Sequence, residues 1–210
     1  MDRDAKLRQL AELNAQVNQL ETELAAEAPT NGWPPKSYYA AYYATTGFML
    51  GTFGAMTSLL ANVIGSLVWS SVTGQQQNPL RLIQVYLTFP LGETALKIDT
   101  GITLAIGCCL YIATGMLYGI LFHLVLTRYT SSSTFAMRMV VASLFSLAIW
   151  LVNFYGILYW LQPLLLGGRW IVELVPPWVA ALTHLVFGWT MVIVYPLGRF
   201  YPYQPQSKPS

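Results

Sequence analysis

Two histidines are the residues of this sequence most able to do chemistry. His123 and His184 are the only histidines among the 210 residues, and both lie inside long apolar stretches. Ionisable side chains within a membrane-spanning helix are uncommon and are candidates for a functional site. Three roles are open to them: a neutral imidazole that hydrogen-bonds between helices, a proton relay or ion site, and a haem or metal ligand. We favour the interhelical hydrogen bond.

The two histidines lie at different depths in the spans that we predict below. His123 lies about 21 residues from the outer end of its span, whereas His184 lies about 6 residues from the outer end of its own. Because an α-helix rises 1.5 Å per residue, the depths of the two residues differ by roughly 22 Å. One haem or metal ion cannot be held by both side chains of a single chain. We therefore predict neither a metal nor a cofactor.

The other polar residues at depth point to helix packing. We expect Asn62 and Asn153 to hydrogen-bond across helix interfaces. No Asp, Glu, Lys or Arg lies in the middle of a span, whereas coupled transporters usually carry a membrane carboxylate or a broken helix. The GxSxG, HExxH and P-loop motifs are also missing from the sequence. These absences argue against an enzyme and weaken the case for a transporter.

The composition favours helices that cross a membrane. Hydrophobic residues make up 55% of the chain and charged residues only 10%, whereas soluble domains carry about 25% charged residues. A hydrocarbon core of about 30 Å needs roughly 20 apolar residues in helical form. Four stretches satisfy this requirement, near residues 45–70, 102–126, 137–161 and 178–197. The predicted fold class is an all-α integral membrane protein with a bundle of four transmembrane helices.

The remaining segments surround this transmembrane domain, which we place at residues 45–198. Residues 29–44 are predicted to be a linker and interface, and residues 199–210 a cytoplasmic tail. The connection between the first two spans is predicted to hold a short interfacial helix near 79–89, with Arg81, Gln84 and Thr88 on one polar stripe. A re-entrant hairpin is the alternative.

Residues 1–28 are predicted to form an amphipathic, coiled-coil-like helix on the cytoplasmic side. Its apolar residues recur at alternating spacings of three and four, the a/d pattern of coiled coils: Leu10, Leu13, Val17, Leu20 and Leu24. The segment carries more acidic than basic residues, which disfavours binding to anionic lipid. We expect it to dock to another membrane protein subunit or to a second copy of the chain.

Basic residues predict the orientation in the membrane. With a cytoplasmic N-terminus, eight of the 11 Lys and Arg residues fall on the cytoplasmic side and three on the other, as the positive-inside rule requires. Both termini are therefore expected to be cytoplasmic. The expected location is the cell's inner membrane, which the chain crosses several times. The stretches 80–90 and 181–188 resemble small bacterial inner-membrane proteins of uncharacterised function.

Small residues predict where helices touch. Glycines spaced four apart let two helix backbones approach closely. Gly47 and Gly51 in the first span lie at depths similar to those of Gly115 and Gly119 in the second, so we expect these helices to meet there. Gly188 in the fourth span marks a further close contact.

The sequence favours a non-catalytic membrane protein that serves as an accessory or structural subunit of a larger membrane complex. The alternative is a small transporter or channel with polar sites at His123, His184 and Asn62. A haem-binding electron-transfer subunit is a third, weaker reading. The expected partners are membrane lipid and other membrane proteins, and the small net charge of +2 argues against nucleic acid.

Overall fold

The computed structural model describes residues 3–27, 36–74, 78–99 and 101–200. It is 90% helical, and the described residues contain no strand. The chain divides into two compact units, residues 1–39 and residues 40–210. We describe each unit by itself.

The first unit contains one long helix, α1 (Arg3–Glu27). No Gly or Pro interrupts it, and Ala, Leu, Gln and Glu, which favour helices, make up much of its sequence. Gln19 Nε2 donates to Glu23 Oε1 at 2.9 Å, a pair spaced four residues apart on the polar surface. Four apolar side chains of the a/d stripe are between 51% and 58% exposed within the structure: Leu10, Leu13, Val17 and Leu20. The side chain of Leu24, the fifth residue of this predicted stripe, lies outside the described residues.

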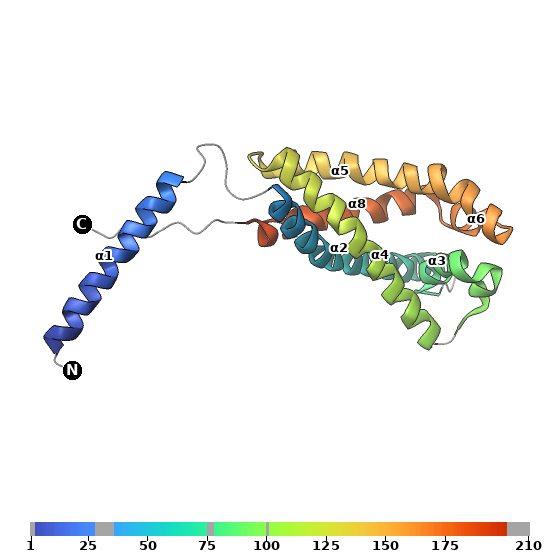
Figure 1. The fold of residues 1–210 in the computed structure, drawn as a ribbon. Coiled ribbons are helices and arrows are strands. Elements are labelled where there is room, and N and C mark those ends of the chain that lie inside the picture. The colour runs from blue at the N-terminus through green and yellow to red at the C-terminus, as the bar shows by residue number, and fades with distance from the viewer. Residues whose placement is uncertain (1–2, 28–35, 75–77, 100, 201–210) are drawn as a thin grey trace. The chain divides into compact units, whose positions relative to one another are not determined.

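The second unit contains four helices that are long and apolar enough to cross a membrane, which supports a multi-pass membrane protein (Figure 1). They are α2 (Lys36–Thr73), α4 (Gly101–Thr130), a continuous third span and α8 (Pro177–Val194). The third span joins α5 (Phe135–Leu151), the π-helix η2 (Val152–Leu158) and α6 (Tyr159–Leu166). The first three predicted spans each lie inside one of these helices, and the fourth, near 178–197, covers α8 and continues into the 3-10 helix η3 (Tyr195–Gly198).

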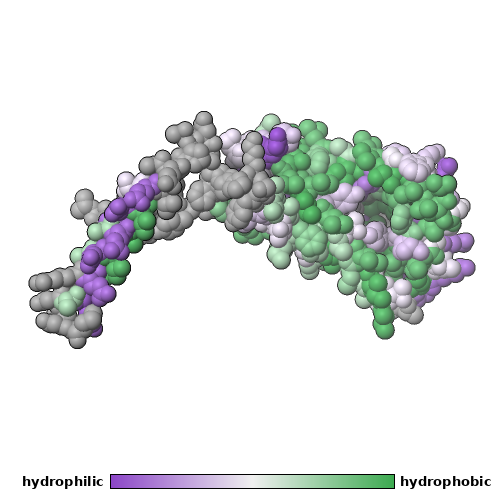
Figure 2. Space-filling model, viewed as in Figure 1, coloured by the Kyte–Doolittle hydropathy of each residue, from purple (hydrophilic) through white to green (hydrophobic). Residues whose placement is uncertain are grey.

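The face of this unit that Figure 2 shows is largely apolar, as its green surface indicates. On α2, one face alone exposes a row of large apolar side chains at helical spacing: Met49, Phe53, Met56, Leu60, Ile64 and Leu67. A water-soluble protein rarely exposes so large a contiguous apolar patch. The surface is therefore suited to contact with lipid.

Local signals set the bounds of the helices. The Oγ1 of Thr134 accepts a hydrogen bond from the backbone N–H of Met137 and caps the start of α5. Pro177 occupies the first turn of α8, where a missing N–H costs nothing. Gly167, with φ of +83°, ends α6 in the left-handed conformation that favours glycine. The third span thus extends through Pro163 to Leu166, beyond the predicted end near residue 161.

The helix α2 also differs from the sequence-based boundary. It is helical from Lys36, whereas we placed the beginning of the span near residue 45. Ala40 and Ala41, the residues that favour helices most, continue the helix through part of the predicted linker. Tyr42 and Tyr43 pack edge to face within it, with ring centroids 5.3 Å apart.

Glycines bring α2 and α4 into backbone contact. A Cβ built on Gly51 would lie 2.6 Å from the carbonyl oxygen of Gly115, and one built on Gly47 would lie 2.7 Å from that of Gly119. The structure therefore places these four glycines together, as the spacing predicts. Gly188 occupies an equivalent place on α8, where a Cβ would collide with the Oγ of Ser146 on α5.

The bundle has two different ends. We call the end where α2 begins and α8 gives way to η3 (Tyr195–Gly198) the terminal end. At the opposite end, the loop end, α3 (Arg81–Leu91), η1 (Gly92–Lys97) and α7 (Trp170–Leu174) pack between the spans. An apolar core near the terminal end joins α2, α4, α5, α8 and η3: Leu50, Ala55, Phe122, Leu126, Ala142, Phe187, Met191, Val192 and Tyr195.

The helix α3 corresponds to the interfacial helix predicted near 79–89, but of its polar stripe only Arg81 is exposed. A helix lying flat on the membrane would turn Gln84 and Thr88 outward, whereas both side chains are buried. Gln84 Nε2 donates to the carbonyl of Ile98 at 2.8 Å, and Gln162 Nε2 on α6 donates to Thr88 Oγ1 at 2.9 Å. These bonds satisfy polar groups that burial would otherwise penalise, so the stripe joins α3 to its neighbours.

Candidate functional site

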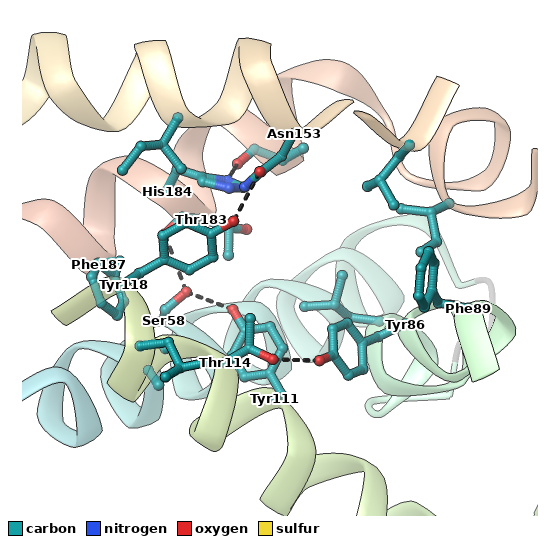
Figure 3. Close-up of a pocket in the computed structure, with 18 of the residues that line it drawn as sticks. Ser58, Tyr86, Phe89, Tyr111, Thr114, Tyr118, Asn153, Thr183, His184 and Phe187 are labelled. Atoms are coloured by element: carbon teal, nitrogen blue, oxygen red, sulfur yellow. Dashed lines mark hydrogen bonds between the residues drawn. The ribbon is translucent and has the colours of Figure 1, made fainter. Parts of the chain in front are cut away.

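A cavity of about 550 Å³ lies in the middle of the bundle (Figure 3). Its size falls within the roughly 300–1,000 Å³ of small-molecule pockets. Side chains from α2, α3, α4, α5, η2, α7 and α8 line it, and most of them are apolar. Eight residues bring polar groups to the lining: Ser58, Tyr86, Tyr111, Thr114, Tyr118, Asn153, Thr183 and His184.

The course of the third span makes room for this cavity. In Figure 1, the end of α4 and the beginning of α5 lie close together near the terminal end, and the two helices diverge toward the loop end. The π-helix η2 continues α5 in that direction, and the backbone N–H of Tyr159 at its end reaches the carbonyl of Phe154 five residues earlier. A π-helical turn is wider than an α-helical one and often marks a functional site. Asn153 and Phe154 of η2 both line the cavity.

One wall of the cavity is a chain of hydrogen bonds that joins α4, α2 and α8. Ser58 Oγ donates to the carbonyl of Thr183 at 3.1 Å. A hydroxyl has a single proton, so Tyr111 OH is the donor in its 2.9 Å contact with Ser58 Oγ. Asn62 Nδ2 donates to Thr183 Oγ1 at 2.9 Å, just behind this wall. Asn62 therefore bonds across a helix interface, as we expected.

A second polar contact ties α3 to α4. Thr114 Oγ1 donates to the carbonyl of Leu110 at 3.0 Å. It therefore accepts the proton of Tyr86 OH across a distance of 2.6 Å. This bond holds the ring of Tyr86 at the edge of the cavity, where Tyr111 packs against it at a centroid distance of 5.7 Å.

The opposite wall carries the side chains of Asn153 and His184, each of which has one nitrogen that the described residues leave for a further hydrogen bond. Tyr118 OH donates to Asn153 Oδ1 at 2.8 Å. The carbonyl of Ala180 can only accept, so His184 Nδ1 donates to it at 2.8 Å. A neutral imidazole then presents Nε2 as an acceptor. Within the part of the chain that the structure describes, neither His184 Nε2 nor Asn153 Nδ2 takes a protein hydrogen bond.

The cavity opens sideways, toward the surface that suits lipid. Several lining residues on α4, η2 and α3 are also exposed on the outside of the bundle: Leu110, Leu117, Ile157 and Phe89. Figure 2 shows the surface hollowed among green residues on this side. A molecule that reaches the cavity through this opening comes from an apolar surrounding.

A second cavity, of about 820 Å³, lies toward the loop end. It shares Leu82, Val175 and Thr183 with the first cavity, so these side chains form the wall between the two. Its lining is more polar and includes Arg81, Asp99 and residues already described on α2 and α3. Asn62 faces this second cavity.

His123 belongs to neither cavity. It is fully buried near the terminal end, where its Nε2 lies 3.2 Å from the carbonyl oxygen of Gly198. Its ring lies between those of Tyr43 and Tyr195, at centroid distances of 5.7 and 5.5 Å. Because the carbonyl accepts, Nε2 is the donor, and the buried Nδ1 has no partner within the described residues. The structure thus keeps the two histidines at separate sites.

The sequence-based reasoning identified part of this site. Asn153 and His184 line the first cavity, Asn62 lines the second, and His123 lines neither. It missed the hydroxyl groups of Ser58, Tyr86, Tyr111, Tyr118 and Thr183. One signal was available, because Tyr111 and Tyr118 lie seven residues apart, two helical turns, in the interior of an apolar span. No cluster of three or more His, Cys, Asp or Glu side chains suited to a metal ion occurs in the described residues.

Comparison with known proteins adds no relative. No protein-family model matches the chain, and neither a curated protein nor a solved structure is similar to it.

Proposed function

We propose that this protein is a non-catalytic subunit of a larger membrane assembly, which it joins through α1. One observation carries the proposal: the a/d stripe of α1 leaves four apolar side chains more than half exposed within the structure. Most of the stability of a helix in a protein comes from packing of its apolar face against a neighbour. A partner helix that covers the stripe would stabilise it.

The charges on α1 favour a different protein over a second copy. In the heptad that contains Leu20, Glu21 and Glu23 occupy the e and g positions beside the stripe. These positions make interhelical salt bridges and select partners. A partner helix with Lys or Arg at the facing positions gains attraction, whereas a second copy offers only Glu, Gln and Asn there. The proposed partner is therefore a helix with basic flanks.

The alternative of a small transporter or channel receives less support. It would use His123, His184 and Asn62 together, but these residues line no common cavity. The hydrogen bonds of His123 and Asn62 stay within the protein. Both residues are explained by helix packing.

Native-gel electrophoresis of the full chain, extracted from its own membrane with a mild detergent, tests the proposal. The wild type should migrate in a large assembly. Leu13→Glu together with Leu20→Glu should release it, because two charges then replace the d positions of the stripe. Ala11→Glu together with Asn18→Glu adds the same charge at b positions and should leave the assembly intact. Migration of the wild type as a monomer or homodimer contradicts the proposal.

A further inference from the structure

We infer that the central cavity binds an uncharged lipid with one apolar chain and a hydroxyl group in its head, which reaches it sideways from the bilayer between α4 and η2. This inference rests on the cavity alone and does not depend on the proposed assembly through α1.

The lining suits an apolar chain. Many of the lining side chains offer carbon surface only, among them Leu82, Phe122, Ile149 and Phe187. A chain that enters from hydrocarbon exchanges one apolar surrounding for another, and it gains dispersion contacts with a lining that otherwise faces empty space. The volume of about 550 Å³ suits a ligand with one chain, since pockets of roughly 300–1,000 Å³ enclose small molecules.

The polar groups define the head. His184 Nε2 can accept one hydrogen bond, and Asn153 Nδ2 can donate. Figure 3 shows the side chains of both His184 and Asn153 on the wall of the cavity. A hydroxyl group both donates and accepts, so it can pair with the acceptor of His184 as well as with the donor of Asn153. A head that only accepts would leave His184 Nε2 without a partner.

The head must also be neutral. The described residues that line the cavity include no Asp, Glu, Lys or Arg. An ion placed among apolar side chains loses its hydration, and nothing here compensates for the loss. Fatty acids and phospholipid heads therefore fit poorly, whereas a monoacylglycerol or an isoprenoid alcohol carries the required chemistry.

The opening explains how such a molecule arrives. Leu117 is 59% exposed on the outside of α4 and also lines the cavity, and Leu110 and Ile157 share this arrangement. A molecule dissolved in the bilayer meets this opening directly. A water-soluble solute would first have to leave water for the apolar outer surface.

Photo-crosslinking of the full chain in lipid nanodiscs tests the inference. Two diazirine probes carry the hydroxyl head, a monoacylglycerol and an isoprenoid alcohol, and labelling by either one at cavity residues supports the inference and tells the two chain types apart. A fatty acid and a phosphatidylcholine with the same diazirine chain are the charged comparisons. Equal or stronger labelling of the cavity by either charged probe overturns the inference, as does no labelling above background by both hydroxyl probes.

Two variants locate the site. Ala113→Trp should abolish labelling, because Ala113 lines the cavity and is exposed on α4. Ala148→Trp is the matched control, since Ala148 is exposed on α5 away from the cavity. Both changes place the new ring on exposed surface, and both variants should elute from size exclusion as the wild type does. Labelling that survives Ala113→Trp unchanged contradicts the inference.

A third variant tests the hydrogen bond between His184 and the hydroxyl head of the ligand. His184→Phe keeps a ring but removes the acceptor, and the loss of one hydrogen bond should lower labelling by the monoacylglycerol about fivefold. A methyl ester probe with the same chain has no hydroxyl, and its labelling should not change. Equal losses for both probes would show that the variant disturbs the cavity itself, and this result would refute the assigned role of His184.

Discussion

Gly51→Ala is expected to weaken the contact between α2 and α4 through a single methyl group. A Cβ at this position would lie 2.6 Å from the carbonyl oxygen of Gly115 and 2.8 Å from the Cα of Met116. Ordinary van der Waals contact begins at 3.4 Å, so the helices must separate by roughly 0.8 Å. Both obstacles are backbone atoms, which no change of side-chain rotamer can move.

The size of the effect follows from the cost of overpacking. Extra methyl groups in a well-packed interface destabilise by about 1–3 kcal/mol. For a chain of this length, each kcal/mol shifts Tm by roughly 2–4 °C. With a cost of about 2 kcal/mol, Gly51→Ala should lower Tm by about 4–8 °C.

Thermal unfolding in mild detergent, followed by tryptophan fluorescence, measures the effect. Gly65→Ala is the matched control on the same helix, because no atom lies within 4 Å of a Cβ built there. It should leave Tm unchanged or raise it slightly, since alanine favours helix more than glycine does. A Tm for Gly51→Ala equal to that of Gly65→Ala would refute the close contact.

Three further changes test other parts of the bundle by the same unfolding measurement. Tyr111→Phe removes the proton donated to Ser58 and should lower the free energy of unfolding by about 1 kcal/mol. An unchanged Tm would mean that this hydrogen bond contributes nothing to stability. Gln162→Leu leaves the buried N–H of Ile171 without its acceptor and should lower the free energy of unfolding by about 1–3 kcal/mol. An unchanged or raised Tm would contradict the role of Gln162 in joining α6 to α3 and α7. Thr134→Ala removes the cap of α5 and should cost about 1 kcal/mol, and a smaller loss for Thr134→Ser would attribute the cost to the hydroxyl.

Some features could be predicted because one physical requirement governs them. A helix that crosses hydrocarbon needs a minimum length of apolar residues, so the four apolar stretches indicate four long helices directly. The contact at Gly47 and Gly51 followed for a similar reason. Small residues spaced four apart lie on one face of a helix, and the depths of the facing glycines follow from counting residues.

Other features depend on how separate segments meet. The polar stripe of α3 has the same residue spacing whether it faces water or a buried partner. Its partial burial becomes clear only from the hydrogen bonds that Gln162 and Ile98 make with it in the folded structure. The central cavity could not be predicted from the sequence for the same reason. It lies between α4 and the third span, which diverge toward the loop end, and no residue pattern within either helix specifies that divergence.

The depth argument for the histidines led to separate sites, and the structure places them so. Counting residues cannot show what surrounds each ring. His123 is enclosed by Tyr43, Tyr195 and Gly198, whereas His184 faces a cavity. The two histidines both lie within apolar spans, but one is enclosed by protein groups and the other is open to a cavity.

The glycine contact between α2 and α4 also makes the bundle unevenly stiff along its axis. Close-packed interiors have low compressibility, and near the terminal end two backbones touch with no side chain between them. Farther along the same two helices the cavity replaces packed atoms. The bundle is therefore expected to be more compressible at the level of the cavity than at the level of the glycine contact.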